Sequence, residues 1–573
     1  MQTWVQRFPE RLEHELDAFR ERGLTVELDE RSLELQGRVI LRGSIAWRGE
    51  DVALEVVYPD SYPYLRPQVY APGLVLDRHQ NPYGGNLCLL DQSPGAWMPE
   101  ETAAWLVSER VPHLLELVDA GGETLRAEEA PQGEPVSAYF PWLQGAVIFV
   151  PAGALAVEAS ATSGSGRILC RVDEPPRLRL RGLIGELIVK SRKRKVRTVA
   201  SADRALAAHF RGDEVPFRWV RLESPPAAAS AEGVLAAAEA AHPGIVESPR
   251  HRVGDGRVSI AGVVFKEEVR QGVYEDTWLF AVRACRPNGA EIPPYLIHSE
   301  RLTPEDMGAR IPTVAGLANK TVAIVGVGAL GSTIALELAR AQVGELRLLD
   351  HDHVETGTTV RWAGGLSAVG HLKVDVLERR IEADHPFTRC VPFRYQIGQS
   401  ALVRTGRKET ELDVLGRLLD GADLVIDASA DLSVQQFVAS MAEARDIPQL
   451  FVSATEGARG GVVAPAIPGA GGCWLCLQWH LETGSLPTPP RADTGTVQPR
   501  GCGSPTFTGT SFDLLPIAAQ ASRVAASMLG GRSNGEVSVC SIPASDDGSP
   551  PVWESRPLNR HQRCPACSAV AAA

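Results

Sequence analysis

Long hydrophobic runs are missing from this sequence of 573 residues. No uncharged apolar stretch is long enough to cross a bilayer, and residues 1–23 lack the apolar core of a signal peptide. Positive charge is also scarce, because 70 acidic residues outweigh 58 lysines and arginines and leave a formal net charge of -12. An acidic balance argues against general nucleic-acid binding, which needs excess positive charge. We therefore expect a cytoplasmic protein without a membrane segment, whose partners are proteins and small ligands.

Cysteine is scarce as well, with ten residues in the whole chain, which excludes a disulfide scaffold as the basis of the fold. Four of the ten form two Cys-x-x-Cys pairs, Cys473 with Cys476 and Cys564 with Cys567. One pair alone could be a redox dithiol, but two pairs are the usual ligand set of a tetrahedral structural zinc site. We predict that these four thiolates bind Zn²⁺ and fix the C-terminal tail to its domain.

The chain is too long for a single hydrophobic core and is expected to be multidomain. Residues 1–145 combine amphipathic helices with alternating strand-like segments, an α+β pattern. Residues 146–310 alternate short strand-like runs with an alanine-rich helix at 227–241, which predicts a mixed α/β middle or linker domain without assigned chemistry. Residues 311–573 alternate apolar strands at 322–325, 346–349 and 424–426 with helices, which predicts a Rossmann-like, doubly wound parallel sheet.

A glycine fingerprint follows the first of these strands, with Gly326, Gly328 and Gly331 at the start of a helix. Such glycines let the backbone turn tightly and approach phosphates at a helix N-terminus. The next strand ends at Asp350, where an acidic group can hydrogen-bond ribose hydroxyls. Taken alone, the fingerprint predicts an NAD-dependent dehydrogenase, so the neighbouring residues must decide.

The order of residues after the fingerprint resembles the ThiF/MoeB-type adenylating domains of the family that activates ubiquitin, molybdopterin synthase and the sulfur carrier of thiamine biosynthesis. The residues that carry this resemblance are Asp350, Asp352, Arg361, Lys373 and Asp427. The resemblance implies that Asp350 and Asp352 face ATP and that Arg361 and Lys373 stabilise charge as pyrophosphate leaves. The family's domains are usually dimers, so the resemblance also implies a homodimer.

Two positions depart from the family's pattern. Thr358 stands where the family usually has asparagine, and Ala430 stands where it has the aspartate that holds Mg²⁺. Asp427 or Asp431 must then supply the magnesium carboxylate, and we favour Asp427.

A single cysteine, Cys502, lies between the two zinc pairs, at the end of a Pro-, Gly- and Thr-rich segment from 486 to 503 that is predicted to form a long mobile loop. An acyl adenylate needs a soft nucleophile that can reach it and then carry the acyl group away. A glycine-flanked thiol on a loop meets this need. We predict that Cys502 forms a thioester, and the alternative is a stray surface thiol or occasional disulfide chemistry.

A second candidate thiol, Cys88, lies near the N-terminus. A proline-rich stretch at 57–69 is followed by His79, Asn81, Cys88 and then the tripeptide 97–99, Trp-Met-Pro. This succession resembles the ubiquitin-conjugating enzymes, although Gln80 replaces the proline of their His-Pro-Asn motif. The resemblance implies that Cys88 accepts the acyl group by transthiolation and that Asn81 positions the loop or stabilises the oxyanion. The alternative is a buried cysteine in a generic α+β domain.

The order of the two domains resembles bacterial fusion proteins of CBASS, the cyclic-oligonucleotide antiphage defence, which attach the C-terminus of a nucleotidyltransferase (the CD-NTase) to acceptor proteins. The resemblance covers roughly residues 1–120 and 310–570. It implies a ligase that adenylates a partner's C-terminal carboxylate, carries it on Cys502 and Cys88, and conjugates it to an amine. The alternatives are a sulfur-carrier adenylyltransferase, a dinucleotide-dependent oxidoreductase and a non-catalytic scaffold that binds a ubiquitin-like protein.

Overall fold

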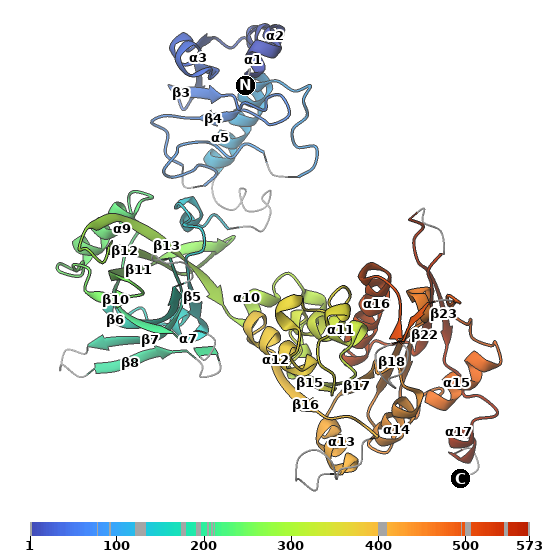
Figure 1. Ribbon diagram of the computed structural model, residues 1–573. Helices are drawn as coiled ribbons and strands as arrows, with labels where there is room; N and C mark the ends of the chain where they lie inside the picture. The colour runs from blue at the N-terminus through green and yellow to red at the C-terminus, as the bar shows by residue number, and fades with distance from the viewer. Residues whose placement is uncertain are drawn as a thin grey trace. The chain divides into compact units, whose positions relative to one another are not determined.

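The computed structural model describes residues 3–76, 78–90, 93–120, 133–172, 179–190, 196–202, 206–207, 210, 212–398, 410–493, 495–498, 506–543 and 548–570 (Figure 1). The chain divides into two compact units. The first comprises Met1–Asp203 and Phe210–Leu302, and the second comprises Arg204–His209 and Thr303–Ala573. Within the described ranges, no helix is both long and apolar enough to traverse a lipid bilayer.

The N-terminal part of the first unit is an antiparallel sheet packed against helices. The strand order is β1 (Val26–Leu28), β2 (Ile40–Trp47), β3 (Glu50–Val57) and β4 (Gln68–Tyr70). The helices are α1 (Trp4–Arg7), α2 (Pro9–Glu21), α3 (Glu30–Gln36), α4 (Ala103–Trp105), the π-helical turn η1 (Leu106–Arg110) and α5 (Val111–Ala120). Alternate strand residues such as Leu54 and Val56 point inward and pack with Phe19 of α2. Helices and sheet together give the α+β arrangement that the sequence predicts.

The middle part of the first unit is a barrel, that is, a sheet closed into a ring of strands. The ring runs through β11 (Gly256–Arg270), β12 (Val273–Cys285), β13 (Glu291–Leu302), β5 (Val147–Pro151), β7 (Leu180–Lys190), β6 (Ser163–Val172) and β9 (Asp213–Arg221), and β9 pairs again with β11. Strands β8 (Val196–Ser201) and β10 (His251–Val253) pair with β7 and β11. The interior is filled by buried side chains such as Ile148, Trp219 and Phe280.

Helices are a minor component of this middle part, which consists mainly of strands. The predicted mixed α/β pattern therefore gave too much weight to helices. The described helical elements are η2 (Val136–Tyr139), α7 (Ala152–Leu155) and α9 (Ala231–Ala241), and α9 packs on a second apolar cluster with Val263 and Leu279. Strand β11 is buried almost continuously along its length. A strand that is covered on both sides loses the apolar and polar alternation by which sequence patterns identify strands.

The second unit is built on one mixed sheet. Its order is β16 (Arg389–Arg394), β15 (Glu345–Asp350), β14 (Thr321–Val325), β17 (Leu424–Asp427), β18 (Gln449–Ala454), β19 (Gly460–Ala466), β22 (Glu536–Ser541) and β23 (Val552–Pro557). The pairings from β16 to β18 are parallel, and those from β18 to β23 are antiparallel. The three strands predicted from the sequence are confirmed as β14, β15 and β17.

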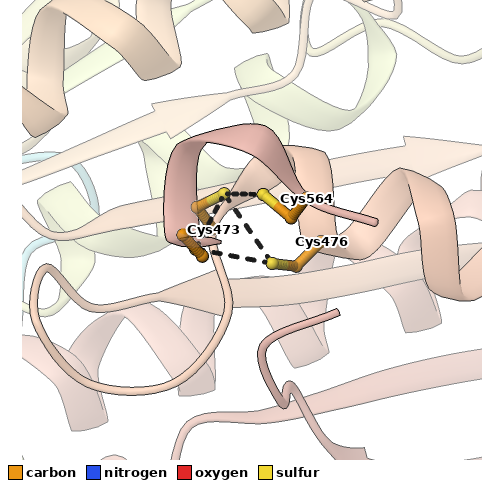
Figure 2. Close-up of side chains that lie close together, drawn as sticks. Cys473, Cys476 and Cys564 are labelled. Atoms are coloured by element: carbon orange, nitrogen blue, oxygen red, sulfur yellow. Dashed lines mark hydrogen bonds between the residues drawn. The ribbon is translucent and has the colours of Figure 1, made fainter. Parts of the chain in front are cut away.

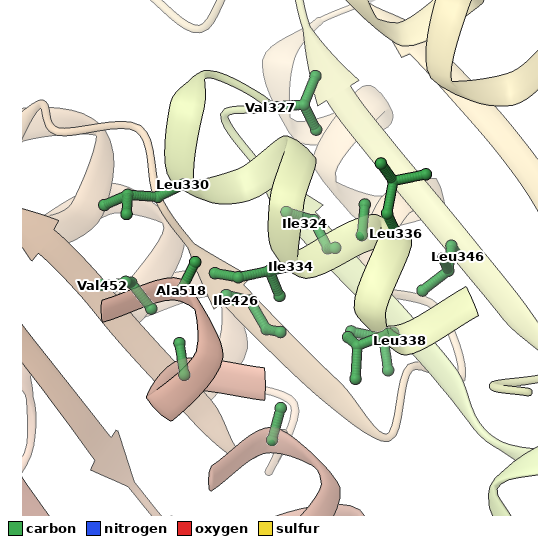
Figure 3. Close-up of a cluster of buried hydrophobic side chains, with 14 of the residues drawn as sticks. Ile324, Val327, Leu330, Ile334, Leu336, Leu338, Leu346, Ile426, Val452 and Ala518 are labelled. Atoms are coloured by element: carbon green, nitrogen blue, oxygen red, sulfur yellow. The ribbon is translucent and has the colours of Figure 1, made fainter. Parts of the chain in front are cut away.

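Helices cover both faces of this sheet. On one face α11 (Ala329–Arg340), α12 (Lys373–Asp384) and α16 (Ser511–Leu529) enclose a large apolar cluster that includes Ile334 and Ala518 (Figure 3). On the other face α13 (Glu411–Leu419) and α14 (Leu432–Glu443) pack on a second cluster. The chain leaves β14 toward β15 and β16, then crosses to β17 on the opposite side of β14. This reversal creates a topological switch point, where open α/β sheets bind their ligands.

Candidate functional site

The glycine fingerprint forms the turn between β14 and α11, and its three glycines have different roles. Gly326 has a φ of +80°, and a Cβ there would lie 2.6 Å from the Cα of Ser429. A Cβ on Gly331 would lie 2.0 Å from the carbonyl oxygen of Gly326. In contrast, a Cβ on Gly328 would meet no atom of the described residues within 4 Å. Two glycines are therefore required by the fold, whereas Gly328 leaves space beside the helix N-terminus.

That space is a cavity of about 250 Å³ at the switch point. Its lining includes most of the cofactor residues predicted from the sequence, namely Gly326, Gly328, Asp350, Asp352, Arg361 and Lys373. Gly331 and Asp427 are not part of the lining. Backbone N–H groups at the start of α11 and two cationic side chains thus face one compact volume, which suits a phosphate-bearing ligand.

The acidic residues that follow β15 are already engaged with the protein. Asp350 is 8% exposed, and its two carboxylate oxygens accept hydrogen bonds from the backbone N–H groups of Val327 and Asp352, each at 2.8 Å. Asp350 therefore holds the glycine turn in place as well as lining the cavity. Asp352 lies 2.8 Å from Lys373 Nζ. Partial burial works to raise the pKa of Asp352, but the hydrogen bond and charge of Lys373 outweigh it and lower that pKa.

Arg361 connects the cavity to Thr506 and Phe507. Its guanidinium donates to the carbonyl oxygen of Phe507 and, at 2.9 Å, to Thr506 Oγ1, and it lies 5.0 Å from the centre of the Phe507 ring. Thr506 and Phe507 form β21, which pairs with β20 (Thr496–Val497). Cys502 itself lies outside the described residues. The Arg361 contacts could not be predicted from the sequence, because nothing in the motif order links position 361 to position 507.

The predicted magnesium ligand Asp427 lies behind the cavity wall. It is 1% exposed, and one carboxylate oxygen accepts hydrogen bonds from the N–H and hydroxyl of Ser429, while the other has no hydrogen-bond partner among the described residues. Burial raises the pKa of Asp427 to about 6, against the lowering effect of Ser429. Asp431 accepts from the first N–H groups of α14. Asp350 and Asp352, which do line the cavity, fit the oxygen-ligand preference of Mg²⁺ better.

The four cysteines of the two Cys-x-x-Cys pairs lie together, next to α15 (Trp474–Glu482), which packs on β18, β19 and β22. Cys473 precedes α15, and Cys564 precedes α17 (Pro565–Val570). The Sγ–Sγ distances are 3.9 Å for Cys473–Cys476, and 3.6 Å for Cys473–Cys564, Cys476–Cys567 and Cys473–Cys567. Figure 2 shows Cys473, Cys476 and Cys564 close together. Four sulfurs around a tetrahedral Zn²⁺, with Zn–S bonds of about 2.3 Å, would lie about 3.8 Å apart. The residues therefore fit the zinc ion predicted from the sequence.

In the first unit, Cys88 is exposed on the segment that follows β4. Its N–H donates to the carbonyl oxygen of His79 at 2.7 Å. The Asn81 side-chain oxygen accepts from the N–H groups of Tyr83 and Gly84, each at 2.9 Å. Asn81 is therefore placed to fix the turn before Cys88, which is one of the two roles that the sequence suggests for it.

The fold and the cavity together define the class of the second unit. Residues 307–528 match the family model described as the ThiF family. This match confirms the ThiF/MoeB-type domain predicted for this part of the chain. The resemblance of the complete domain order to antiphage fusion proteins stays a prediction.

Two relatives span the chain almost completely. The first, "Uncharacterized protein y4oA" of Sinorhizobium fredii, is 31% identical over 609 residues, covering 99% of this chain and 98% of that protein. The second, "Uncharacterized protein y4qC" of the same organism, is 30% identical over 573 residues, covering 92% and 91%. The chain belongs to the same family as these two proteins. A more distant relative, "Adenylyltransferase and sulfurtransferase MOCS3" of Sus scrofa, is 29% identical over 181 residues, which is 31% of this chain and 35% of that protein.

Proposed function

We propose that this chain uses ATP to adenylate the C-terminal carboxylate of a partner protein, carries the acyl group as a thioester on Cys502 and then on Cys88, and conjugates it to an amine of an acceptor protein. The observation that carries the proposal is the cavity of the ThiF-family domain. There, the glycine turn faces Arg361 and Lys373 at the switch point of the sheet. The name of the relative MOCS3 includes an adenylyltransferase activity, which supports the same first step.

The first step follows from the charges in the cavity. The partner's carboxylate attacks the α-phosphorus of ATP, the bond to the β-phosphate oxygen breaks, and pyrophosphate leaves with the electron pair. Arg361 and Lys373 line this cavity, and in the proposed step their positive charges compensate the negative charge that develops on the phosphates. When bound with ATP, Mg²⁺ would neutralise further phosphate charge, and Asp352 and Asp350 are the cavity carboxylates able to hold it.

The later steps need two thiols. The Cys502 thiolate attacks the acyl carbon and displaces AMP, and the Cys88 thiolate then displaces Cys502. An amine finally displaces Cys88 and forms an amide. The exposure of Cys88 supports its part in this relay, and the contact of Arg361 with Phe507 supports a link between nucleotide and loop. The domain order favours a CD-NTase as the activated partner, and a homodimer is proposed from the ThiF-type domain.

The test is incubation of the full chain with ATP, Mg²⁺ and a lysate of its own host, followed by a non-reducing gel and mass spectrometry. The wild type should carry a reductant-sensitive polypeptide on Cys88, and the Cys502→Ala variant should lose it. The Cys88→Ala variant should retain the adduct on Cys502. ATP-dependent adducts on neither thiol, with a host CD-NTase added in purified form, would refute the relay.

A sulfur-carrier adenylyltransferase is the second candidate, because MOCS3 is named a sulfurtransferase as well. It shares the first step but has no use for Cys88. In that case, Cys88→Ala would leave the final product unchanged, and mass spectrometry would find a thiocarboxylate at the partner's C-terminus in place of an amide.

A further inference from the structure

The segment from 133 to 140, which lies between the N-terminal part and the barrel strands, is fixed to the barrel. Ser137 donates from its N–H and its hydroxyl to Glu267, at 2.8 and 2.7 Å. The Glu134 N–H donates to Glu268 at 3.3 Å, and Phe140 is buried in the apolar cluster under α9. A Cβ on Gly133 would lie 2.4 Å from the carbonyl oxygen of Glu268, so the two backbones are in close contact. The position of the segment is therefore set by the barrel.

The same segment contacts the loop that carries Cys88. Both carboxylate oxygens of Glu134 accept from the His79 N–H, at 3.0 and 2.9 Å, and one lies 3.3 Å from His79 Nδ1. The His79 carbonyl oxygen in turn accepts from the Cys88 N–H at 2.7 Å. A single residue thus joins Glu134 to Cys88. His79 has a φ of +60°, an unusual value for a side chain of its size, and the bonds on both sides of it hold that conformation.

Two flanking contacts dock this loop further. Arg78 forms an ion pair with Glu268. The Tyr83 hydroxyl donates to the carbonyl oxygen of Pro226 at 2.7 Å, and its ring packs edge-on against Phe140, with centroids 5.4 Å apart. The barrel therefore forms part of the surroundings of Cys88.

The surroundings of Cys88 raise the pKa of its thiol, so they do not favour the reactive thiolate. Loss of surrounding water and the Glu134 carboxylate raise the pKa of Cys88, and Arg66 lowers it. Burial, followed by the charges of Cys88 and Glu134, raises the pKa of Tyr139 on the same segment. A carboxylate beside a nucleophilic thiol disfavours the thiolate, which is the reverse of the usual arrangement at reactive cysteines. The same carboxylate favours a cation, and a lysine amine reaches the site as an ammonium ion at neutral pH.

We propose that Glu134 selects a protonated amine as the acceptor and orients it toward the acyl group on Cys88. The side chain of Glu134 is 21% exposed, so an incoming ammonium group can reach it. This role rests on the proposed function, because it requires a thioester on Cys88. In the step itself, the ammonium releases one proton to water and its lone pair bonds to the acyl carbon. The carbon–sulfur bond breaks, and the Cys88 sulfur leaves with the electron pair. The nitrogen loses its second proton as the amide forms, this proton ends on the Cys88 thiol, and Glu134 stays ionised.

The test compares two nucleophiles in single-turnover discharge of the full chain after loading with partner. Free lysine is cationic at pH 7.5, whereas hydroxylamine is neutral. Glu134→Gln keeps an oxygen that can accept from the His79 N–H but removes the charge. We expect it to slow discharge onto lysine about fivefold and to leave discharge onto hydroxylamine unchanged. The difference should shrink as the pH rises through about 10.4, where the lysine side-chain amine loses its charge. Glu50→Gln, an exposed carboxylate at the β2–β3 turn, is the matched control and should change neither rate.

A second measurement needs no acyl chemistry. The pH profile of Cys88 alkylation by iodoacetamide should move to lower pH in Glu134→Gln, because a negative charge near the thiol has been removed. Equal slowing with both nucleophiles would mean a purely structural role and would overturn the proposal, as would unchanged discharge. No adduct on Cys88 in the wild type would overturn the proposed function, and with it this role, whatever the alkylation profile shows.

Discussion

Gly328 offers a clean separation of ligand binding from folding. Its φ of -67° is negative, with a ψ of -152°, and an added methyl group would meet no atom of the described residues within 4 Å. The change Gly328→Ala should therefore leave the fold intact. The methyl group would instead occupy the place where a phosphate approaches the turn between β14 and α11.

The size of the effect follows from the contacts that are lost. A hydrogen bond from a backbone N–H to a charged phosphate contributes about 1.5–3 kcal/mol, so losing one such bond weakens binding roughly 10- to 150-fold. Calorimetric titration with ATP measures this ratio, and thermal melting followed by circular dichroism checks the fold. Gly331→Ala is the matched control, because its Cβ would lie 2.0 Å from the Gly326 oxygen and should lower the melting temperature. Wild-type ATP affinity in Gly328→Ala, with a fold that is intact, would refute the phosphate-binding role of the turn.

Three further predictions concern the second unit. Metal analysis should find one Zn²⁺ per chain, and the Cys476→Ser variant should lose this ion and melt at a lower temperature. A zinc content of Cys476→Ser equal to that of the wild type would contradict the four-sulfur site. Burial raises the pKa of Asp427 to about 6, so its ionisation lowers the free energy of unfolding progressively as pH rises from about 4 to 6. Asp427→Asn should therefore be more stable than the wild type at pH 7.5, by at most about 3 kcal/mol. Thermal melts over this pH range should show that the advantage vanishes below about pH 4. Arg361→Lys keeps the positive charge but loses the paired hydrogen bonds to Thr506 and Phe507. ATP binding should therefore weaken less than tenfold, while protease cleavage after Phe507 should accelerate. A cleavage rate equal to that of the wild type would show that these bonds do not hold β21.

The sequence predicted the parts of the fold whose signals are local. The strands at 322–325, 346–349 and 424–426 are short apolar runs bounded by turns, and the glycine turn marks where the first of them ends. The grouping of the four cysteines could also be predicted from their spacing, because two Cys-x-x-Cys pairs in one chain usually bind a metal ion together.

The features that the sequence did not reveal depend on pairing across long separations. Closure of the barrel requires β9 to pair with β11. A strand that is buried along its length, such as β11, lacks the alternation of apolar and polar residues that would predict this pairing. The contact of Glu134 with His79 arises only when the barrel fixes the segment from 133 to 140. Asp427 illustrates a third limit, since the motif order indicates an acidic residue but not that its side chain is buried and does not line the cavity.

The barrel also has a mechanical consequence. Its first strand, β5, and its last, β13, lie side by side in parallel, with Ile148 opposite Ser299 and Pro151 opposite Leu302. Tension applied to the two ends of the chain would pull on the start of β5 and on the end of β13, which lie at opposite ends of this pair. All hydrogen bonds between the two strands would then bear the load together, in shear, and could not open one after another. Stretching in an optical trap should find the barrel resistant to force.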